Sequence, residues 1–253
     1  MSEVIWGHHI DKSFHVATSD VAVLKDVTFS VKVGDFSIIY GPSGCGKSTL
    51  LHIILGLEAP TSGQIQVLSY NLYSLSEDER ADFRKHHIGM VYQQPNWIRA
   101  LTVLENVAFP LTLLGEERIS TLYKAEKLLK KVEMAEWGSY IPTELSSGQQ
   151  QKVALARALI SDPELIIADE PTGNLDFESG QELMRLLTDL NEQGKTILMV
   201  THDLAYLRFA KTAIHMFNGQ IQNEYVGKEI QKLFKNAESK QIESQVLASK
   251  KIC

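Results

Sequence analysis

Apolar and polar residues alternate through much of the first third of the chain, a pattern that favours β-strands over helices. The apolar runs are short, rich in β-branched and aromatic residues, and separated by turns that contain Gly34 or Gly63. The expected strands cover residues 27–31, 36–40, 64–68 and 88–92. We therefore predict that the first third of the chain is mainly β-structure.

Between Trp97 and Leu159 the apolar residues adopt a helical spacing instead. One face of a predicted helix is formed by Ile119, Leu122, Ala125, Leu128, Leu129 and Val132. Steps of three and four residues place such side chains on the same side of a helix, where they can pack together. This region is predicted to be a helical insertion.

Short, strongly apolar strands return in the second half of the chain, with helical segments between them. The predicted strands cover residues 165–168, 196–200 and 213–217, and a predicted helix covers residues 178–193. Apolar strands that alternate with helices are typical of a parallel sheet covered by helices on both faces. The expected fold class is therefore α/β, with a doubly wound core.

These patterns divide the chain into four regions. We expect a core with a β subdomain at 1–93, a helical subdomain at 94–160, the second part of the core at 161–226, and a polar tail at 227–253. In the tail, the apolar residues Ile230, Leu233, Phe234 and Ala237 support at most a short amphipathic helix.

Composition restricts the class of protein. The 253 residues, 44% of them hydrophobic, suffice for one large α/β domain with a subdomain. No apolar run is long enough to cross a bilayer, and the N-terminus lacks the features of a signal peptide, so we expect a cytoplasmic protein. Two cysteines provide no disulfide framework, and a net charge of −6 argues against a broad nucleic-acid surface.

A glycine-rich turn follows the predicted strand 36–40 and precedes a helical run. It consists of Gly41, Pro42, Ser43, Gly44, Cys45, Gly46, Lys47, Ser48 and Thr49. The spacing fits G-x-x-x-x-G-K-[ST], in which backbone N–H groups surround a polyphosphate at the positive end of a helix. Lys47 is expected to reach the terminal phosphates and Ser48 to ligate Mg²⁺. The alternative is an ordinary glycine-rich turn, which the flanking strand and helix disfavour.

A pair of carboxylates follows the predicted strand 165–168. Asp169 and Glu170 would lie at the carboxyl edge of a parallel sheet, where ligands bind in open α/β folds. Because successive strand residues point in opposite directions, Asp169 can face Mg²⁺ while Glu170 faces a water in line with the terminal phosphate. An apolar strand that ends in two acids is commonly just a strand that reaches solvent, but the phosphate loop favours the catalytic interpretation.

A second anion-binding turn precedes a predicted helix that covers residues 153–159. Ser146, Ser147, Gly148 and Gln149 form this turn. Free N–H groups at a helix start attract negative charge, although ordinary helix capping is the simpler alternative. The chain then has two phosphate-type turns and only one of them has a lysine, which suggests that two copies each donate one turn to a shared nucleotide.

Five motifs, taken together, resemble those of the ATP-binding cassette (ABC) ATPases in order and spacing. They lie at residues 41–49, 145–152, 166–170, 174–176 and 201–203. The resemblance covers about residues 3–226 and implies a P-loop NTPase core with an antiparallel β subdomain and an inserted α-helical subdomain. It also implies ATP and Mg²⁺ as cofactors and a head-to-tail homodimer, in which Ser146 and Gly148 of one copy close over ATP held by Lys47 of the other. Ser147 departs from the glycine usual in the family, which suggests slower closure or turnover.

The resemblance also assigns roles to residues whose types alone indicate little. It implies that Gln93 is a mobile ligand linking Mg²⁺ to the helical subdomain and that Asp176 contacts the partner copy. His202 is implied to steady the γ-phosphate and the catalytic Glu170. Phe14 lies where the family often has an aromatic residue under the adenine, and a plain core phenylalanine is the alternative.

Within the family, the chain looks most like the LolD/MacB group, on residues 75–84, 88–94 and 101–111. That resemblance implies ATP hydrolysis that drives lipoprotein release or macrolide or peptide export through a separate FtsX-like membrane permease. The chain would then lie on the inner face of the cytoplasmic membrane, with the helical subdomain as the docking region. The alternatives are a soluble cassette ATPase acting on ribosomes or DNA and a P-loop small-molecule kinase.

Overall fold

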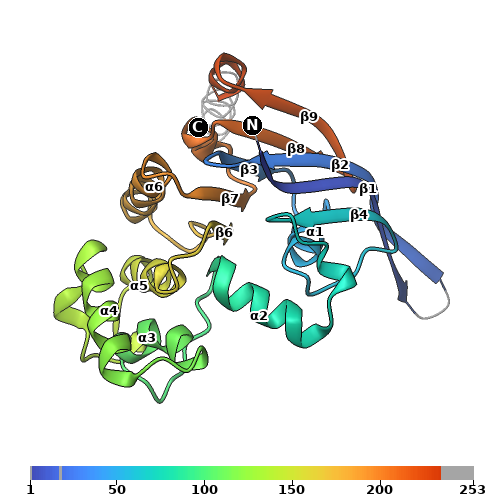
Figure 1. Cartoon of the computed structure of the whole chain (residues 1–253). Helices are drawn as coiled ribbons and strands as arrows, with labels where there is room; N and C mark the ends of the chain where they lie inside the picture. The colour runs from blue at the N-terminus through green and yellow to red at the C-terminus, as the bar shows by residue number, and fades with distance from the viewer. Residues whose placement is uncertain (1, 17–18, 235–253) are drawn as a thin grey trace, which may run out of the picture.

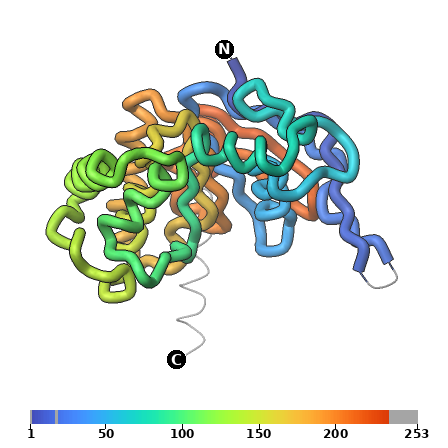
Figure 2. The backbone as a smooth tube through the Cα atoms, turned by 60° about the horizontal axis from the view of Figure 1, so that its bottom comes forward, coloured from blue at the N-terminus to red at the C-terminus, as the bar shows by residue number. Residues whose placement is uncertain are grey.

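The computed structural model describes residues 2–16 and 19–234, which form two β-sheets and a set of helices (Figures 1 and 2). The first sheet is antiparallel, with the strand order β2-β1-β4. Its strands are β1 (Glu3–Val16), β2 (Ser19–Lys32) and β4 (Ser62–Val67). β1 and β2 form a long hairpin, and its far end projects from the body of the molecule on the right of Figure 1.

The second sheet has six strands in the order β5-β6-β7-β3-β8-β9. They are β3 (Phe36–Tyr40), β5 (Ile88–Tyr92), β6 (Leu165–Asp169), β7 (Thr196–Thr201), β8 (Thr212–Phe217) and β9 (Gln220–Val226). Neighbouring strands are parallel from β5 to β8, and β9 pairs antiparallel with β8. The loops that leave the parallel strands therefore share one edge of the sheet.

Helices connect most of these strands. The α-helices are α1 (Lys47–Ile54), α2 (Glu77–His87), α3 (Val103–Leu113), α4 (Arg118–Lys131), α5 (Ser147–Leu159) and α6 (Phe177–Glu192). Short 3₁₀ turns are η1 (Leu72–Ser74), η2 (Ala135–Trp137), η3 (Pro142–Glu144) and η4 (Leu204–Phe209). Helices α3 and α4 lie at the end of the molecule away from the hairpin (Figure 2). Among residues 2–16 and 19–234, no helix combines the length and apolar character needed to span a membrane.

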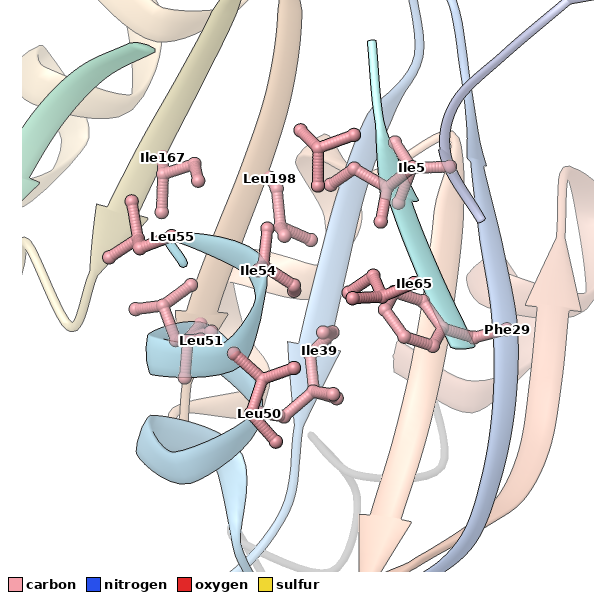
Figure 3. Packing of buried hydrophobic residues seen from close by; sticks show 14 of the residues in the cluster. Ile5, Phe29, Ile39, Leu50, Leu51, Ile54, Leu55, Ile65, Ile167 and Leu198 are labelled. Atoms are coloured by element: carbon pink, nitrogen blue, oxygen red, sulfur yellow. The ribbon is translucent and has the colours of Figure 1, made fainter. Parts of the chain in front are cut away.

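Helix α1 lies between the two sheets. Its residues Leu50 and Ile54 are fully buried, and Figure 3 shows them among Ile39 and Leu198 of the parallel sheet and Ile65 of the antiparallel sheet. A helix that is apolar on more than one side packs against more than one partner. Because α1 follows the glycine-rich turn directly, this packing fixes the turn relative to both sheets.

The six-stranded sheet also contributes to a second core. Leu155 of α5 and Leu187 of α6 pack there with Ile166 and Met199 of the strands. Residues 228–234 are helical, and Ile230 is buried in the same core. This part of the polar tail therefore packs on the domain, whereas Ala237 lies outside the described residues.

The helical insertion has a core of its own, made by α3, α4 and α5. Val107 of α3, Ala125 and Leu129 of α4, and Val153 of α5 are all buried in it. The predicted apolar face is confirmed from Leu122 to Val132, where Ala125 and Leu129 pack inward, but it is wrong for Ile119, which lies at the start of α4 and is 75% exposed. Helix α5 contributes to both cores and so connects the insertion to the six-stranded sheet.

The apolar pattern predicts the central strands well and misses three outer elements. The predicted strands 36–40 and 88–92 coincide with β3 and β5. β1 was missed because charged and histidine residues and several register shifts interrupt its alternation. β9 has no buried residue, and Phe83 is the sole buried residue of α2. Elements that bury so few side chains carry little periodic signal.

The contact between β5 and α5 leaves no room for a side chain at Gly89. An added Cβ atom would lie 2.3 Å from Ala158 O and 2.9 Å from Pro163 Cγ. We expect Gly89→Ala to lower the free energy of unfolding by about 1–3 kcal/mol, the usual cost of overpacking, in urea denaturation. Gly138→Ala is the matched control, because its Cβ would meet only contacts of 3.6 Å or more. Equal midpoints for the two variants would contradict this close packing.

Candidate functional site

Loops from four neighbouring strands meet at one edge of the parallel sheet because the strands end in register. Tyr92 of β5 pairs with Asp169 of β6, which pairs with Val200 of β7. Tyr40 of β3 pairs with Thr201 of β7. The residues that follow these strand ends are Gln93, Glu170, His202 and Gly41. The structure therefore brings four of the predicted site segments together.

The glycine-rich turn has little free space on its inner side. A Cβ atom at Gly41 would lie 2.0 Å from Met216 O, and one at Gly46 would lie 2.8 Å from Leu24 Cδ2. Gly46 also has a φ of 104°, a conformation that residues with side chains rarely adopt. Gly46 caps α1 without a side-chain hydrogen bond, so the first N–H groups of this helix remain available to an anion.

Lys47 is charged but only 5% exposed, because the turn itself binds its ammonium group. Nζ donates to Gly41 O at 2.9 Å and to Pro42 O at 3.0 Å. In the rest of the turn, Pro42, Ser43, Gly44 and Ser48 are exposed, Gly46 and Thr49 are half-buried, and Cys45 is buried. Ser48 is therefore accessible to a ligand, and Lys47 is held beside the glycines.

Asp169 has an unpartnered buried oxygen at the end of β6. Among the residues that the structure describes, its Oδ1 has no hydrogen-bond partner. Burial raises the pKa of Asp169, the charge of Glu170 raises it further, and His52 and Lys47 oppose the shift. A buried carboxylate oxygen that lacks a donor is a suitable ligand for a hard cation such as Mg²⁺.

Glu170 and His202 are joined directly. His202 Nδ1 and Glu170 Oε2 are hydrogen-bond partners, and Glu170 N donates to Val200 O at 2.9 Å. Glu170 has a φ of 46°, a backbone conformation that costs a residue with a side chain on the order of 1–3 kcal/mol. The side chain of Glu170 is thus oriented by a strained turn and by one histidine.

Gln93 lies against the turn that follows Glu170. A Cβ atom at Gly173 would come 2.7 Å from Gln93 Nε2, and Gly173 N donates to Glu170 O at 3.0 Å. A hollow of about 260 Å³ opens beside it, and Ser147 and Asn174 are among the residues that line this hollow. Gln93 is therefore close both to the paired carboxylates and to the start of α5.

The predicted turn before α5 is a helix cap. Ser146 Oγ accepts from Gln149 N at 3.3 Å, and Gln149 Oε1 accepts from Ser146 N at 2.9 Å. This capping box pairs the N–H groups of Ser146 and Gln149. The N–H groups of Ser147 and Gly148 lie in the first turn of α5, where a helix offers them no backbone acceptor, so they can bind an anion. Gly148 is packed tightly, since a Cβ atom there would lie 2.6 Å from Ser179 Oγ.

Asp176 caps the next helix, α6. Its Oδ1 accepts from Ser179 N at 2.9 Å and its Oδ2 from Ser179 Oγ at 3.0 Å. The backbone N–H of Ser179, followed by the Ser179 hydroxyl, lowers the pKa of Asp176. Because Ser179 touches the Gly148 site, the two predicted segments 146–149 and 174–176 are neighbours in the fold.

Phe14 lies near the end of the β1–β2 hairpin, where its backbone pairs with Val21. The ammonium group of Lys12 is 4.7 Å from the centroid of its ring. Lys12 is itself buried, and its Nζ donates to Ala59 O at 2.7 Å. One face of Phe14 is therefore occupied by a fixed cation.

Gln151 lies within the motif at residues 145–152, where the sequence analysis gave it no role of its own, yet its side chain holds the main chain of Gln93. The only available signal was its place next to Gln149 and Gln150 in the predicted turn and helix. A contact between residues so far apart in sequence depends on the packing of α5 against β5, which periodicity does not specify.

Residues 24–173 match the family model described as ABC transporter. The chain belongs to the ABC transporter family. Three of the five motifs of this ABC protein, at residues 41–49, 145–152 and 166–170, lie within the matched residues. Because the match extends over more than half of the 253 residues, the phosphate loop is not an isolated coincidence.

Relatives of this ABC protein are similar over most of its length. It is 42% identical over 224 residues to the ABC transporter ATP-binding protein MJ0796 of Methanocaldococcus jannaschii, covering 85% of this chain and 94% of that one. It is 37% identical over 223 residues to the lipoprotein-releasing system ATP-binding protein LolD of Colwellia psychrerythraea, and the match covers 88% of this chain and 86% of LolD. The macrolide export ATP-binding/permease protein MacB of Chlorobaculum tepidum is 40% identical over 216 residues, 85% of this chain but 33% of MacB.

A solved structure of MJ0796, described as a dimer in a post-hydrolysis state bound to ADP and Pi, matches the fold with a TM-score of 0.82. The match has 38% identity and covers 88% of this chain and 98% of the other. The α/β fold class with an antiparallel and a parallel sheet is confirmed. The chain is an ATP-binding and ATP-hydrolysing subunit of an ABC transporter, which disfavours the ribosome or DNA alternative and the small-molecule kinase.

The half-buried Asp169 carboxylate makes stability depend on pH. Its pKa is raised above the ordinary 3.8, so the folded protein holds this proton to a higher pH than the unfolded chain does. Ionisation therefore costs stability, and the cost grows as pH rises from the ordinary value through the raised one. We expect Asp169→Asn, with chelator and without nucleotide, to raise the Tm at neutral pH and to lose this gain as pH falls.

The exposed Asp189 of α6 provides the control for that measurement. Asp189→Asn removes the same charge from an exposed position, where only the small gain from removing an acid near the C-terminal end of α6 is expected. A gain for Asp189→Asn equal to that for Asp169→Asn, or a gain for Asp169→Asn that widens in acid, would contradict the assignment.

Proposed function

We propose that two copies of this chain enclose two ATP molecules head to tail, so that Ser146 and Gly148 of one copy complete the site that Lys47 begins in the other. The main support is that the chain has two anion-binding helix starts and only one of them carries a lysine. In the described part of the chain, no hydrogen bond or ion pair joins residues 41–49 to 146–149. The dimeric structure of the relative MJ0796 supports such a pairing.

In each site, the N–H groups of residues 41–49 and the ammonium of Lys47 would bind the ATP phosphates. The free N–H groups of Ser147 and Gly148 would approach the terminal phosphate from the partner. Phe14 would stack on the adenine with the ring face that Lys12 leaves open, a contact worth on the order of 1–3 kcal/mol. Asp176, beside the Gly148 turn, would contact the partner copy.

The oxygen donors at the sheet edge fit Mg²⁺. Ser48 is accessible at the start of α1, and Asp169 has an unpartnered buried oxygen in the described part of the chain. Gln93, which carries an amide oxygen, directly follows the strand residue that pairs with Asp169. Hydroxyl, carboxylate and amide oxygens are the hard ligands that this ion prefers. Bound there with ATP, Mg²⁺ would neutralise charge on the phosphates. These three residues are the ones we propose as its ligands.

Glu170 and His202 would prepare the attacking water. The carboxylate would accept a hydrogen bond from the water and orient it toward the γ-phosphate, as phosphoryl transfer mainly requires positioning and charge stabilisation. His202 would hold Glu170 through their hydrogen bond and contact the γ-phosphate. Lys47 would stabilise the charge that develops on the phosphoryl oxygens.

Removal of the Glu170 charge tests both the catalytic role and the dimer. We expect Glu170→Gln to bind ATP normally, to hydrolyse it about 10²–10³-fold more slowly, and to accumulate as an ATP-bound dimer in sedimentation. The exposed Glu178→Gln in α6 is the control and should hydrolyse ATP at the original rate. A monomeric Glu170→Gln variant that hydrolyses ATP freely would overturn the assignment.

We also propose that the chain acts at the inner face of the cytoplasmic membrane with a separate FtsX-like permease, in a system for lipoprotein release or for macrolide or peptide export. The similarity to LolD and MacB supports this choice. The net charge of −6 gives no reason to expect a nucleic-acid partner. Residues 94–160 would act as the helical subdomain that receives the permease.

A groove of about 560 Å³ between α2, β5, α3 and α5 is the docking place that we propose. Its apolar lining includes Leu57, Met90 and Leu113, and its polar lining includes Lys85. Leu57 and Leu113 are 51% and 55% exposed. An amphipathic helix that carries an acidic residue would bury these leucines and meet Lys85.

A crosslinking experiment tests this groove. With a benzophenone amino acid in place of Leu113 in the full chain in cells, we expect light to capture a membrane protein with several spans. The same amino acid at Tyr123, 59% exposed on α4 and outside the groove lining, should capture none. Ribosomal protein captured at Leu113, or equal capture of the membrane protein at both positions, would contradict the proposed docking.

A further inference from the structure

Side chains of α5 hold the segment that leaves β5. Gln151 Nε2 donates to Tyr92 O at 2.9 Å and to Gln93 O at 2.8 Å. Tyr92 is the last residue of β5 and Gln93 the first beyond it, so these carbonyls lie where the regular strand pairing ends. The Gln151 amide is thus the main support for the chain at this point, since the other side-chain donor to Gln93 O, Asn174 Nδ2, is farther away at 3.5 Å.

The contribution of the Gln151 side chain to stability does not by itself explain a glutamine at this position. The residue is 2% exposed, and its Oε1 is buried without a hydrogen-bond partner among residues 2–16 and 19–234. A buried amide oxygen that lacks a partner costs free energy, and an apolar residue of the same volume would avoid that cost. The two hydrogen bonds from Nε2 are the feature that distinguishes glutamine from such a residue.

Three further contacts, made by Gln150 and Arg157, join the same segment to α5. Trp97 Nε1 donates to Gln150 Oε1 at 2.8 Å. Arg157 Nη1 donates to Asn96 O at 2.9 Å, and its guanidinium lies 4.5 Å from the centroid of the Trp97 ring. Residues 92–97 are therefore attached to α5 at several points along the helix.

We propose that Gln151 is a positioning residue that holds the main chain of Gln93. Through its two hydrogen bonds, α5 and the segment at Gln93 would move together. Ser146 and Gly148 lie at the start of α5, so the turn offered to the partner's ATP would move together with the amide that contacts Mg²⁺. The inference rests on the proposed roles of Gln93 and of the Ser146 turn. It adds a specific pair of hydrogen bonds as the connection between them.

The test replaces the amide with a side chain of similar length that has no donor. We expect Gln151→Met to lower kcat for ATP about tenfold in the purified full chain, with the KM for ATP nearly unchanged, because the phosphate loop is intact. Asn191→Leu is the matched control. The Asn191 amide is also buried and donates to two carbonyls, Gly34 O at 3.1 Å and Lys195 O at 2.8 Å, in a part of α6 away from the site.

A merely structural role predicts similar effects for both variants. If Asn191→Leu lowers the Tm as much as Gln151→Met but keeps the original kcat, the lower kcat of Gln151→Met results from the lost hydrogen bonds to the Gln93 segment and not from reduced stability. Equal kcat losses in the two variants, or an unchanged kcat for Gln151→Met, would overturn the inference.

A double-mutant cycle with Gln93→Ala then asks whether Gln151 acts through Gln93. We expect the second substitution to add little to the first, because both interrupt the same connection. Kcat losses that multiply would overturn the inference and leave the role of Gln93 intact. If Gln93→Ala alone has the original kcat, the role proposed for Gln93 fails and the inference fails with it.

Discussion

Parallel pairing in a fixed register is the constraint on which the site depends. β5, β6, β7 and β3 are neighbours whose ends coincide, so that Gln93, Glu170 and His202 leave the sheet side by side although they are far apart in sequence. A shift of one residue in any of these pairs would turn the end residues to the other face of the sheet. Helix α1 packs on one face of these strands and helices α5 and α6 pack on the other, and this packing holds the register.

Several residues at this edge have local arrangements that cost folding free energy. Asp169 has a buried oxygen without a partner in the described part of the chain, and Glu170 occupies a strained backbone conformation. Lys47 is charged and almost fully buried. Such arrangements persist when the surrounding structure determines them, and here the cores around α1 and α5 do so. The apolar cores beneath the site supply the stability of this region, and the polar residues of the site lie at the edge of the sheet above them.

The central fold and the main motifs were predictable because their signals are local. Strands such as 36–40 are continuous apolar runs, and the phosphate loop is a contiguous motif. β1 and α2 were not predictable, because polar residues interrupt the alternation of β1 and occupy most of α2, so that tertiary contacts decide their structure. Gln151 was missed for a related reason. Its partner Gln93 is 58 positions away, and only the packed molecule shows that they touch.

Lys47 shows how such a site behaves toward its ligand. Its ammonium group already donates to two carbonyl oxygens of its own turn. An incoming phosphate therefore exchanges one set of acceptors for another, and the lysine contributes only the difference between them. That difference is largest for an acceptor with high negative charge and a matching shape. The arrangement thus favours discrimination between anions over high affinity, and it keeps the buried ammonium group hydrogen-bonded before a phosphate arrives.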